Sequence, residues 1–281
     1  MKVGIVTPVK DSAKYFTACA ASVAGQTCGG NIKLVHVIQE SSSSRDDCKK
    51  TAERFNAQYY REDDAGLYNA ISRGMSKPSV KCCDILAWLN SDEQYLPGTI
   101  ETVVRVFKDN PKVDLVYGDY LIIGKDGHML SARREIPPRK WYLKNGVNYI
   151  LSCTVFFKKG LWDRLSGFDL SYKYLADKEF YLNALYSGAN FKHINEYLGV
   201  YTSTGENASL NPAAADEQKR VRQKFKAYKC DNFRHAVKLC RYLEKFVNGC
   251  YRKKMISVNL FDFDGNIRNI SGYAGTKWKW E

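Results

Sequence analysis

One acidic segment of this chain directly follows an apolar run that has the length of a buried strand. Residues 84–93, with the sequence DILAWLNSDE, end in four adjacent side chains that carry oxygen, and the last two, Asp92 and Glu93, are acids. Oxygen donors suit hard cations such as Mg²⁺ and Mn²⁺, and a carboxylate at a strand end can hold such an ion against a diphosphate leaving group. Capping of the next helix by Ser91 or Asp92 explains the same residues equally well.

Two further segments place acids at the start of a predicted helix. Residues 62–74 (EDDAGLYNAISRG) begin with acids that include Asp64 and end with Arg73 and a glycine. Residues 172–180 (YKYLADKEF) place Asp177 directly after an aromatic loop, where an acid can serve as a general base. Helix capping and a favourable interaction with the helix dipole account for both segments without any chemistry.

These segments need a frame that brings them together. Over the first 117 residues, short apolar runs alternate with amphipathic stretches. This alternation of strands and helices predicts a parallel sheet covered by helices on both faces, in which ligands gather at the carboxyl ends of the strands. The polar segments 7–11, 39–44, 62–66 and 90–93 lie at those ends. Strands are predicted at 3–7, 32–38, 58–60, 84–89 and 113–117, and helices at 13–24, 46–55, 67–75 and 100–110.

The rest of the chain is less regular. Gly-Lys-Asp-Gly at 124–127 and Asp-Gly-Asn at 264–266 each predict a hairpin between extended runs. Between them the sequence predicts a strand at 154–157, helices at 159–165 and 178–186, an extended run at 191–201, a loop at 207–215 and a pair of basic helices over 216–254.

Several enzyme classes are excluded by the motifs that the chain lacks. It has no GxxxxGK[ST] loop, no GxGxxG after the first strand and no GxSxG elbow. The four histidines show no HExxH pairing, and His36 lies inside a predicted strand, where a structural role is expected.

The three acidic segments, taken in order, resemble the family 2 glycosyltransferases, especially the bacterial colanic-acid and capsule type, over about residues 2–209. The opening VGIVTPVK, which includes Thr7 and Pro8, resembles the family's first strand and its nucleotide-contacting turn. Residues 62–74 resemble the stretch ExDxGIYDAMNKG, which includes Asp64 and Arg73, and LNSDE at 89–93 resembles the metal motif LNSDD. The runs VYGD (116–119), TVFFKKGLW (154–162), GFD (167–169) and ADKEF (176–180) match further family segments.

The resemblance implies a GT-A fold, which is an α/β fold with a mostly parallel central sheet flanked by helices, and an inverting reaction. A hexosyl group would move from a nucleotide-diphospho-sugar, with a UDP-sugar favoured, to a hydroxyl of a glycan or lipid-linked acceptor in surface polysaccharide synthesis. Asp92 would hold Mn²⁺ or Mg²⁺ on the diphosphate, and Asn90 and Ser91 would line the ribose and phosphate. Asp177 would accept the proton of the acceptor hydroxyl, and Glu179 would support the base or the sugar.

Some positions depart from the family pattern. Where the family usually has Asp-Gly after its second strand, with the Asp meeting the base, this chain has Gln39 and Glu40. A glutamine amide still offers both a donor and an acceptor to a uracil edge. Glu93 and Asn69 each replace an Asp, and Asn183 stands near a usual Arg, so the acceptor contacts are expected to differ.

The C-terminal part lies outside the resemblance and carries much of the net charge of +13. We divide the chain into a catalytic domain at 1–210 and a basic helical extension with a terminal hairpin at 211–281. Residues 218–254 hold thirteen Lys or Arg against two acids, with Phe225 and Tyr228 interleaved, which fits an anionic partner. We expect peripheral docking on an anionic membrane, where lipid-linked acceptors reside, rather than nucleic-acid binding. A solvated helix face packed on the catalytic domain explains the same charges.

The expected location is the cytoplasm, peripherally at the inner face of the plasma membrane. The N-terminus lacks the apolar core of a signal peptide, and no apolar run reaches the roughly 18 residues of a membrane span. The nine cysteines show no zinc-site spacing and are expected to be thiols.

Two alternatives to a glycosyltransferase remain at this point. A GT-A nucleotidyltransferase normally has a Gly-rich, basic loop after its first strand, which residues 7–11 lack. A non-enzymatic module would bind nucleic acid or another anionic surface through its basic C-terminal part, beside a degenerate GT-A domain. The presence of both Asp92 and Asp177 argues against degeneracy.

Overall fold

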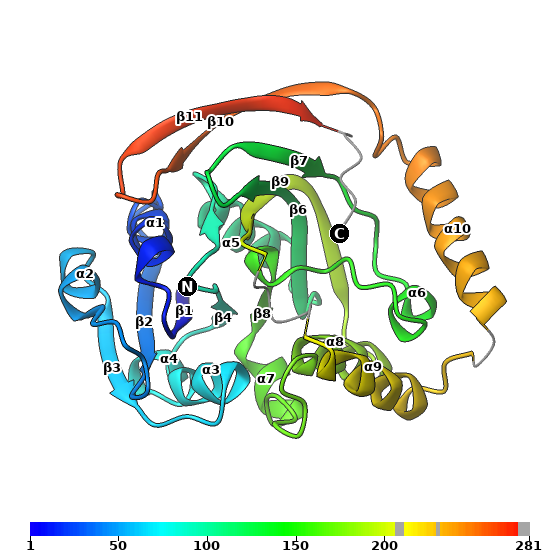
Figure 1. Cartoon of the computed structure of the whole chain (residues 1–281), viewed down its shortest axis with the longest axis horizontal. Coiled ribbons are helices and arrows are strands. Elements are labelled where there is room, and N and C mark those ends of the chain that lie inside the picture. The colour runs from blue at the N-terminus through cyan, green and yellow to red at the C-terminus, as the bar shows by residue number, and fades with distance from the viewer. Residues whose placement is uncertain (206–210, 229–230, 275–281) are drawn as a thin grey trace.

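The computed structural model describes residues 1–205, 211–228 and 231–274. Its N-terminal half alternates strands and helices as the sequence predicts (Figure 1). The elements are β1 (Lys2–Val9), α1 (Ala13–Ala24), β2 (Lys33–Ser41), α2 (Lys49–Arg54), β3 (Gln58–Glu62), α3 (Leu67–Met75), α4 (Pro78–Lys81) and β4 (Ile85–Trp88). Strand β1 pairs in parallel with β2 and β4, and β3 extends the sheet beyond β2. The parallel frame of this half is therefore confirmed.

The second half turns the sheet into a mixed one. Its elements are β5 (Gln94–Tyr95), α5 (Thr99–Asp109), β6 (Leu115–Gly124), β7 (Met129–Arg133), α6 (Lys140–Lys144), the 3₁₀ turn η1 (Ser152–Thr154), β8 (Phe156–Lys158), α7 (Lys159–Leu165), α8 (Ala176–Tyr186) and β9 (Phe191–Ser203). Strand β8 pairs antiparallel with both β4 and β6, so β6 again runs parallel to β4. Both predicted hairpins are present.

The C-terminal part adds α9 (Ala213–Lys224), α10 (Asp231–Val247) and the hairpin of β10 (Lys254–Phe261) and β11 (Ile267–Ala274). Within the described residues the strand order is β10-β11-β7-β6-β8-β4-β1-β2-β3, with β9 paired to β6 and β5. Figure 1 shows the hairpin arching over one side of the sheet, and α10 standing at the margin opposite α1 and α2.

Alternate residues of the central strands supply two cores, one on each face of the sheet. Val6, Leu86 and Trp88 pack with α3 and α8, whereas Ile5 and Ala87 pack with α1 and α5. Because both faces are covered, these strands are apolar throughout. Helix α3 lies very close to β1, since a Cβ added at Gly74 would sit 2.3 Å from Val6 Cγ1.

One helix is shorter than its sequence suggests. A helix is predicted over 46–55, but α2 begins at Lys49. Asp46 and Asp47 lie before the helix, and their carboxylates accept backbone hydrogen bonds. Asp46 accepts from the Ala13 N–H at 2.8 Å, and Asp47 accepts from the Lys49 N–H at 3.1 Å. The eight cysteines within the described residues are all free thiols.

Candidate active site

The carboxyl ends of β1, β2 and β4 bring the predicted donor residues to one edge of the sheet. In the strand register, Pro8 lies beside Gln39, and Val6 lies beside Trp88, two residues before Asn90. Side chains tie the loops together beyond the strands: the hydroxyls of Ser12 and Ser91 are 2.7 Å apart, and the Cys19 thiol donates to the Asn90 carbonyl at 3.4 Å. The sequence therefore placed these residues at the correct edge.

The two acids after β4 have different surroundings. Both carboxylate oxygens of Glu93 are used, one by the Asn90 backbone N–H at 3.0 Å and the other by the Ser152 hydroxyl at 2.7 Å. Glu93 thus holds the turn that carries Asn90, Ser91 and Asp92. For Asp92, the Thr202 hydroxyl donates to its backbone carbonyl, and no hydrogen bond from another described residue reaches its carboxylate.

Among the described residues, no Lys or Arg lowers the pKa of either of these two acids. Burial raises the pKa of both Asp92 and Glu93, and the charge of Asp92 adds to the rise at Glu93. Part of the Asp92 side chain reaches solvent, but the dense protein around it still removes most of its hydration. Two neighbouring carboxyls resist double ionisation unless a cation compensates them. Asp92 is therefore suited to a cation.

Thr7 and Gln39 are both buried, and each side chain has a partner. The Thr7 hydroxyl lies 2.9 Å from His36 Nε2, so its side chain faces the interior, and the whole residue is buried. Gln39 donates from Nε2 to Glu62 at 3.2 Å, while its Oε1 is buried with no partner among the described residues. Because a carboxylate can only accept, Nε2 must be the amide atom that faces Glu62.

The acidic segment before α3 forms a charged cluster and a helix start. Glu62 pairs with Lys77 at 2.6 Å and with Arg73 at 3.5 Å, and the pKa of Glu62 is lowered, chiefly by the hydrogen bond from Lys77. Asp64 accepts from the Gly66 backbone N–H at 2.9 Å, which fixes the turn where α3 begins. Gly66 has a φ of 114°, which a side chain would disfavour.

Asp177 lies in the first turn of α8 and is held by α3, the helix that follows β3. Its Oδ1 accepts from the Tyr68 hydroxyl at 2.9 Å and from the Lys178 backbone N–H at 2.7 Å, which leaves Oδ2 for another partner. Burial raises the pKa of Asp177, and the Tyr68 hydrogen bond opposes that rise. Helix α8 packs on β4, because the Tyr181 ring stacks on Trp88 with centroids 6.3 Å apart.

Sequence comparison identifies the protein family. The sequence profile of Glycosyl transferase family 2 matches residues 4–165, which is more than half of the chain. The chain belongs to this family. This family 2 glycosyltransferase is 25% identical over 222 residues to the "PGL/p-HBAD biosynthesis glycosyltransferase" of Mycobacterium bovis and of Mycobacterium tuberculosis, an alignment that covers 76% of this chain and 80% of those proteins.

Solved structures confirm the GT-A fold. S. aureus TarS 1–349 in complex with UDP superposes with a TM-score of 0.59 at 16% identity, covering 88% of this chain and 72% of that one. The mannosyltransferase PcManGT from Pyrobaculum calidifontis, in complex with GDP-Man and Mn²⁺, gives a TM-score of 0.58 at 13% identity, covering 87% and 75%. Among the helices of the described residues, none combines the length and apolar composition that crossing a membrane requires.

Glu179, two residues after the predicted base of this glycosyltransferase, faces α9. Its Oε1 accepts from Lys224 and from Asn183, and its Oε2 is buried without a partner among the described residues. The side chain is 1% exposed. The contact with Lys224 joins α8 to α9, and it is separate from the contact between Asp177 and Tyr68.

Sequence reasoning missed two residues that position Asp177. Tyr68 lies inside the motif at 62–74, but nothing in the sequence shows that its hydroxyl reaches across to α8. Glu217 in α9 accepts three backbone N–H groups, from Lys173 at 2.6 Å, Tyr174 at 2.8 Å and Leu175 at 3.0 Å. One carboxylate from the C-terminal part therefore anchors the loop that precedes α8.

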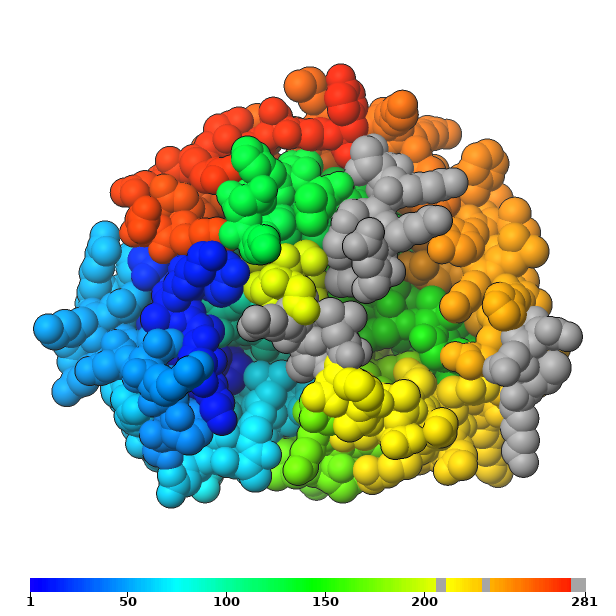
Figure 2. Space-filling model, viewed as in Figure 1, coloured from blue at the N-terminus to red at the C-terminus, as the bar shows by residue number. Residues whose placement is uncertain are grey.

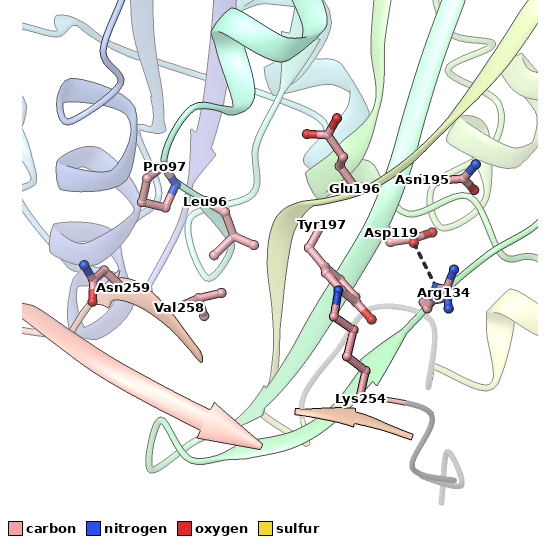
Figure 3. A pocket seen from close by; sticks show the side chains of 10 residues that line it. All are labelled: Leu96, Pro97, Asp119, Arg134, Asn195, Glu196, Tyr197, Lys254, Val258 and Asn259. Carbon is pink, nitrogen blue, oxygen red and sulfur yellow. Dashed lines mark ion pairs between the residues drawn. The ribbon is translucent and has the colours of Figure 1, made fainter. Parts of the chain in front are cut away.

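Two pockets of about 600 and 430 Å³ lie elsewhere, and none of the predicted site residues lines them. The first is bounded by β6, β9 and β10, and Figure 3 shows Asp119 and Arg134 on one side of it, with Arg134 Nε 4.0 Å from Asp119 Oδ2. Asp119, the acid of the VYGD segment, lies within β6 and binds His193 Nε2 and the Glu135 backbone N–H, each at 2.8 Å. The acidic strand-end site is therefore distinct from both pockets.

Proposed function

We propose that this glycosyltransferase is an inverting, divalent-metal-dependent enzyme that transfers a hexosyl group from a UDP-sugar to a hydroxyl of a glycan or lipid-linked acceptor. The observation that supports this most is the state of two acids. No hydrogen bond from another described residue reaches the carboxylate of Asp92, which follows β4. Asp177 keeps Oδ2 for another partner, in a helix whose Tyr181 ring stacks on Trp88 of β4. One acid is suited to the leaving diphosphate and the other to the attacking hydroxyl.

The residues at the end of β4 fit a divalent cation that is only partly held by protein. Among the described residues no group of three or more His, Cys, Asp or Glu side chains is arranged as a metal site. Mg²⁺ and similar ions commonly bind one or two carboxylates together with substrate phosphates and water. Asp92 is the carboxylate that would hold Mn²⁺ or Mg²⁺, and the ion would stabilise the charge that develops on the diphosphate.

Gln39 supports a preference for uracil as the base. Its Nε2 is occupied by Glu62, so its buried Oε1 is the atom that needs a donor. Uracil offers an N–H at N3, where cytosine has an acceptor. Replacing Gln39 by Leu should weaken UDP binding about tenfold through loss of this hydrogen bond. Unchanged UDP affinity in a titration would contradict this assignment.

Asp177 carries the acid–base step of the proposal. As the acceptor oxygen bonds to the anomeric carbon, the bond from that carbon to the diphosphate oxygen breaks and the acceptor proton passes to Oδ2 of Asp177. Attack in line with the leaving group inverts the anomeric centre. The hydrogen bond from Tyr68 to Oδ1 fixes the carboxylate and keeps it ionised more readily than burial alone would allow.

We assign catalysis to residues 1–210 and a supporting role to 211–281, in line with the contact that Glu217 makes to the loop before α8. The acceptor class proposed here is that of surface polysaccharide or glycolipid synthesis, of the colanic-acid and capsule kind, at the cytoplasmic side of the membrane. The mycobacterial relatives are named for PGL/p-HBAD biosynthesis.

A thermal-shift experiment tests the donor site without knowledge of the acceptor. UDP-, GDP- and dTDP-sugars are added with Mn²⁺ to the wild type, to Asp92→Asn and to the control Asp109→Asn, which changes an exposed acid at the end of α5. At a hundredfold excess over Kd, a ligand that binds only the folded state adds about 2.7 kcal/mol to the free energy of unfolding, which raises the melting temperature by roughly 5 °C for a chain of this size.

We expect a shift with the UDP-sugar in the wild type and in Asp109→Asn, and its loss in Asp92→Asn. A full shift in Asp92→Asn would remove Asp92 from the metal assignment. Absence of any shift with all three donors would overturn the proposed function.

A further inference from the structure

Helix α10 turns its charged side toward the protein. Glu135, which is buried, pairs with Arg241 at 2.5 Å and with Lys245 at 3.0 Å. Glu244 accepts from Arg139 at 2.8 Å and from the Tyr142 hydroxyl at 2.6 Å. These contacts place three charged residues of α10 on its inner face, alongside the buried Val237.

The outer face of the same helix is apolar. Leu239, Tyr242, Leu243, Phe246 and Val247 follow the spacing i, i+3, i+4, i+7, i+8, which places them on one stripe along a helix. All five are exposed, Phe246 by 71% and Val247 by 82%. In a globular protein such a stripe normally faces the core. Here the five side chains are exposed, on a helix that stands at the outer margin of the molecule (Figures 1 and 2).

The inner ion pairs prevent the helix from burying this stripe. Rolling α10 by half a turn would bring Leu243 and Phe246 inward, but it would carry Arg241 and Lys245 away from Glu135. A buried carboxylate without its partners is strongly destabilising. Because α10 is fixed in this orientation, the exposed apolar stripe is a stable property of the fold.

Cations flank the stripe. Lys238 is exposed on the helix, and Arg252 and Lys253 are exposed just beyond its end. Between residues 233 and 254 the chain has a single acid, Glu244, whose oxygens are engaged on the inner side. An apolar stripe bordered by Lys and Arg is the pattern of a helix that lies in the interface of an anionic bilayer, with its apolar side about 5 to 10 Å deep.

We propose that α10 docks this protein on an anionic lipid surface, with Leu239, Tyr242, Leu243, Phe246 and Val247 inserted among the lipids. The basic stretch 218–254 includes parts of α9 and the whole of α10, and the proposal assigns docking to α10 rather than to α9. Val221 and Phe225 of α9 are buried, and Glu217 and Lys224 bind the loop before α8 and α8 itself. The inference does not depend on the reaction that the enzyme performs.

A second copy of the chain fits the stripe less well than a bilayer does. The whole of α10 is about 25 Å long and 10 Å wide, so its face covers roughly 250 Å². A stable protein interface buries about 800 Å² on each partner. Pairing two copies through α10 would also bring like charges such as Lys238 and Arg252 together, which an anionic surface would instead attract.

Vesicle co-sedimentation of the full chain tests the proposal. The probes are vesicles of phosphatidylcholine alone and of equal parts phosphatidylcholine and phosphatidylglycerol, each at low and high salt. We expect binding to the anionic vesicles at low salt and weaker binding at high salt. Phe246→Asp should lower the affinity at least about tenfold, and neutralising Arg252 and Lys253 should lower it about fivefold for each charge.

The matched control is Ile267→Asp, which places the same charge at a 70% exposed apolar residue. Ile267 begins β11, at the hairpin turn whose Gly265 approaches Thr17 of α1, on the other side of the molecule from α10. This variant should bind as the wild type does. Phe246→Asp should keep the wild-type melting temperature because Phe246 makes no core contact.

Three results would overturn the proposal. The first is no binding of the wild type to anionic vesicles at low salt. The second is equal binding by Phe246→Asp and the wild type. The third is a dimer in analytical ultracentrifugation that Phe246→Asp dissociates, with no vesicle binding, which would assign the stripe to a second copy of the chain.

Discussion

Removal of the Tyr68 hydroxyl tests the environment assigned to the base. Tyr68 donates to Asp177 Oδ1 at 2.9 Å, and burial keeps the pKa of Tyr68 well above its ordinary value, so the hydroxyl stays a neutral donor in any practical assay. Burial raises the pKa of Asp177, and this hydrogen bond opposes the rise. Tyr68→Phe should therefore raise the pKa of Asp177 further.

The size of this pKa change follows from the charge of the Asp177 carboxylate, which accepts the hydrogen bond. A hydrogen bond to an ionised group contributes about 1.5 to 3 kcal/mol, against roughly 0.5 to 1.5 kcal/mol for a neutral pair. The difference of about 1 kcal/mol corresponds to a fivefold change in the ionisation equilibrium. Because folded Asp177 holds its proton more tightly than the unfolded chain does, its ionisation reduces stability as the pH rises through its titration range. Tyr68→Phe should enlarge that loss.

A double-mutant cycle measures this coupling directly. Urea unfolding of the wild type, Tyr68→Phe, Asp177→Ala and the double variant is followed above and below the titration range of Asp177. We expect a coupling free energy of about 2 kcal/mol where Asp177 is charged and about half of that where it is protonated. Nucleotide release during turnover should fall about fivefold on the acid side of the pH profile and much less on the plateau. A coupling that is near zero, or that is the same at both pH values, would refute the reasoning.

Three further changes probe the support of the site. Glu217→Gln weakens three backbone hydrogen bonds to the loop before α8, so turnover should drop about tenfold while the melting shift with UDP-sugar and Mn²⁺ is kept; equal loss of donor binding would contradict this. Gly199→Ala would put Cβ 2.2 Å from the Cys153 carbonyl oxygen and should cost about 3 kcal/mol in urea unfolding, whereas Gly160→Ala, with open space around its Cβ, should be nearly neutral. Lys224→Met removes the cation beside the buried Glu179 and should lower the free energy of unfolding by about 2 kcal/mol. The loss is smaller than for a fully buried pair because Lys224 is partly exposed. Adding Glu179→Gln should restore most of the lost stability. If Glu179→Gln alone abolishes turnover in a stable protein, Glu179 acts in the reaction instead.

The positions of the proposed donor-side residues could be predicted because these residues lie at or just beyond the carboxyl ends of strands. Pro8, Gln39 and Asn90 each come after a short apolar run, and the carboxyl ends of parallel strands must meet at one edge. The pattern of apolar runs fixes this arrangement without knowledge of any side-chain contact. The same argument correctly placed the acids at 62–66 beyond β3.

The contacts of Asp177 could not be predicted in the same way. Tyr68 and Asp177 are 109 residues apart, and their hydrogen bond depends on how α3 and α8 pack on the same face of the sheet. Glu217 is one acid in a basic helix, and its three backbone partners belong to a loop with no motif of its own. Long-range side-chain pairing of this kind leaves no periodic trace in one sequence.

Helix α10 shows a different limit of pattern reasoning. The sequence predicts a pair of basic helices over 216–254, and α9 and α10 confirm two helices there. In α10, Leu239, Leu243 and Phe246 share one side of the helix. Periodicity identifies the apolar side but not the direction in which it faces. The direction was decided by Glu135, a buried acid more than a hundred residues away, whose charge requires Arg241 and Lys245 on the inner side.

The two sides of the candidate site are therefore held by different kinds of contact. On the donor side, the backbone pairing of β1 with β2 and β4 sets the positions of Pro8, Gln39 and Asn90, and no single side-chain change removes it. On the acceptor side, the position of Asp177 depends on the side chains of Tyr68 and Glu217. Changes that loosen α3 or α9 should consequently reduce turnover while nucleotide binding persists. Loss of both together should follow from damage to the sheet itself, since both sides rest on it.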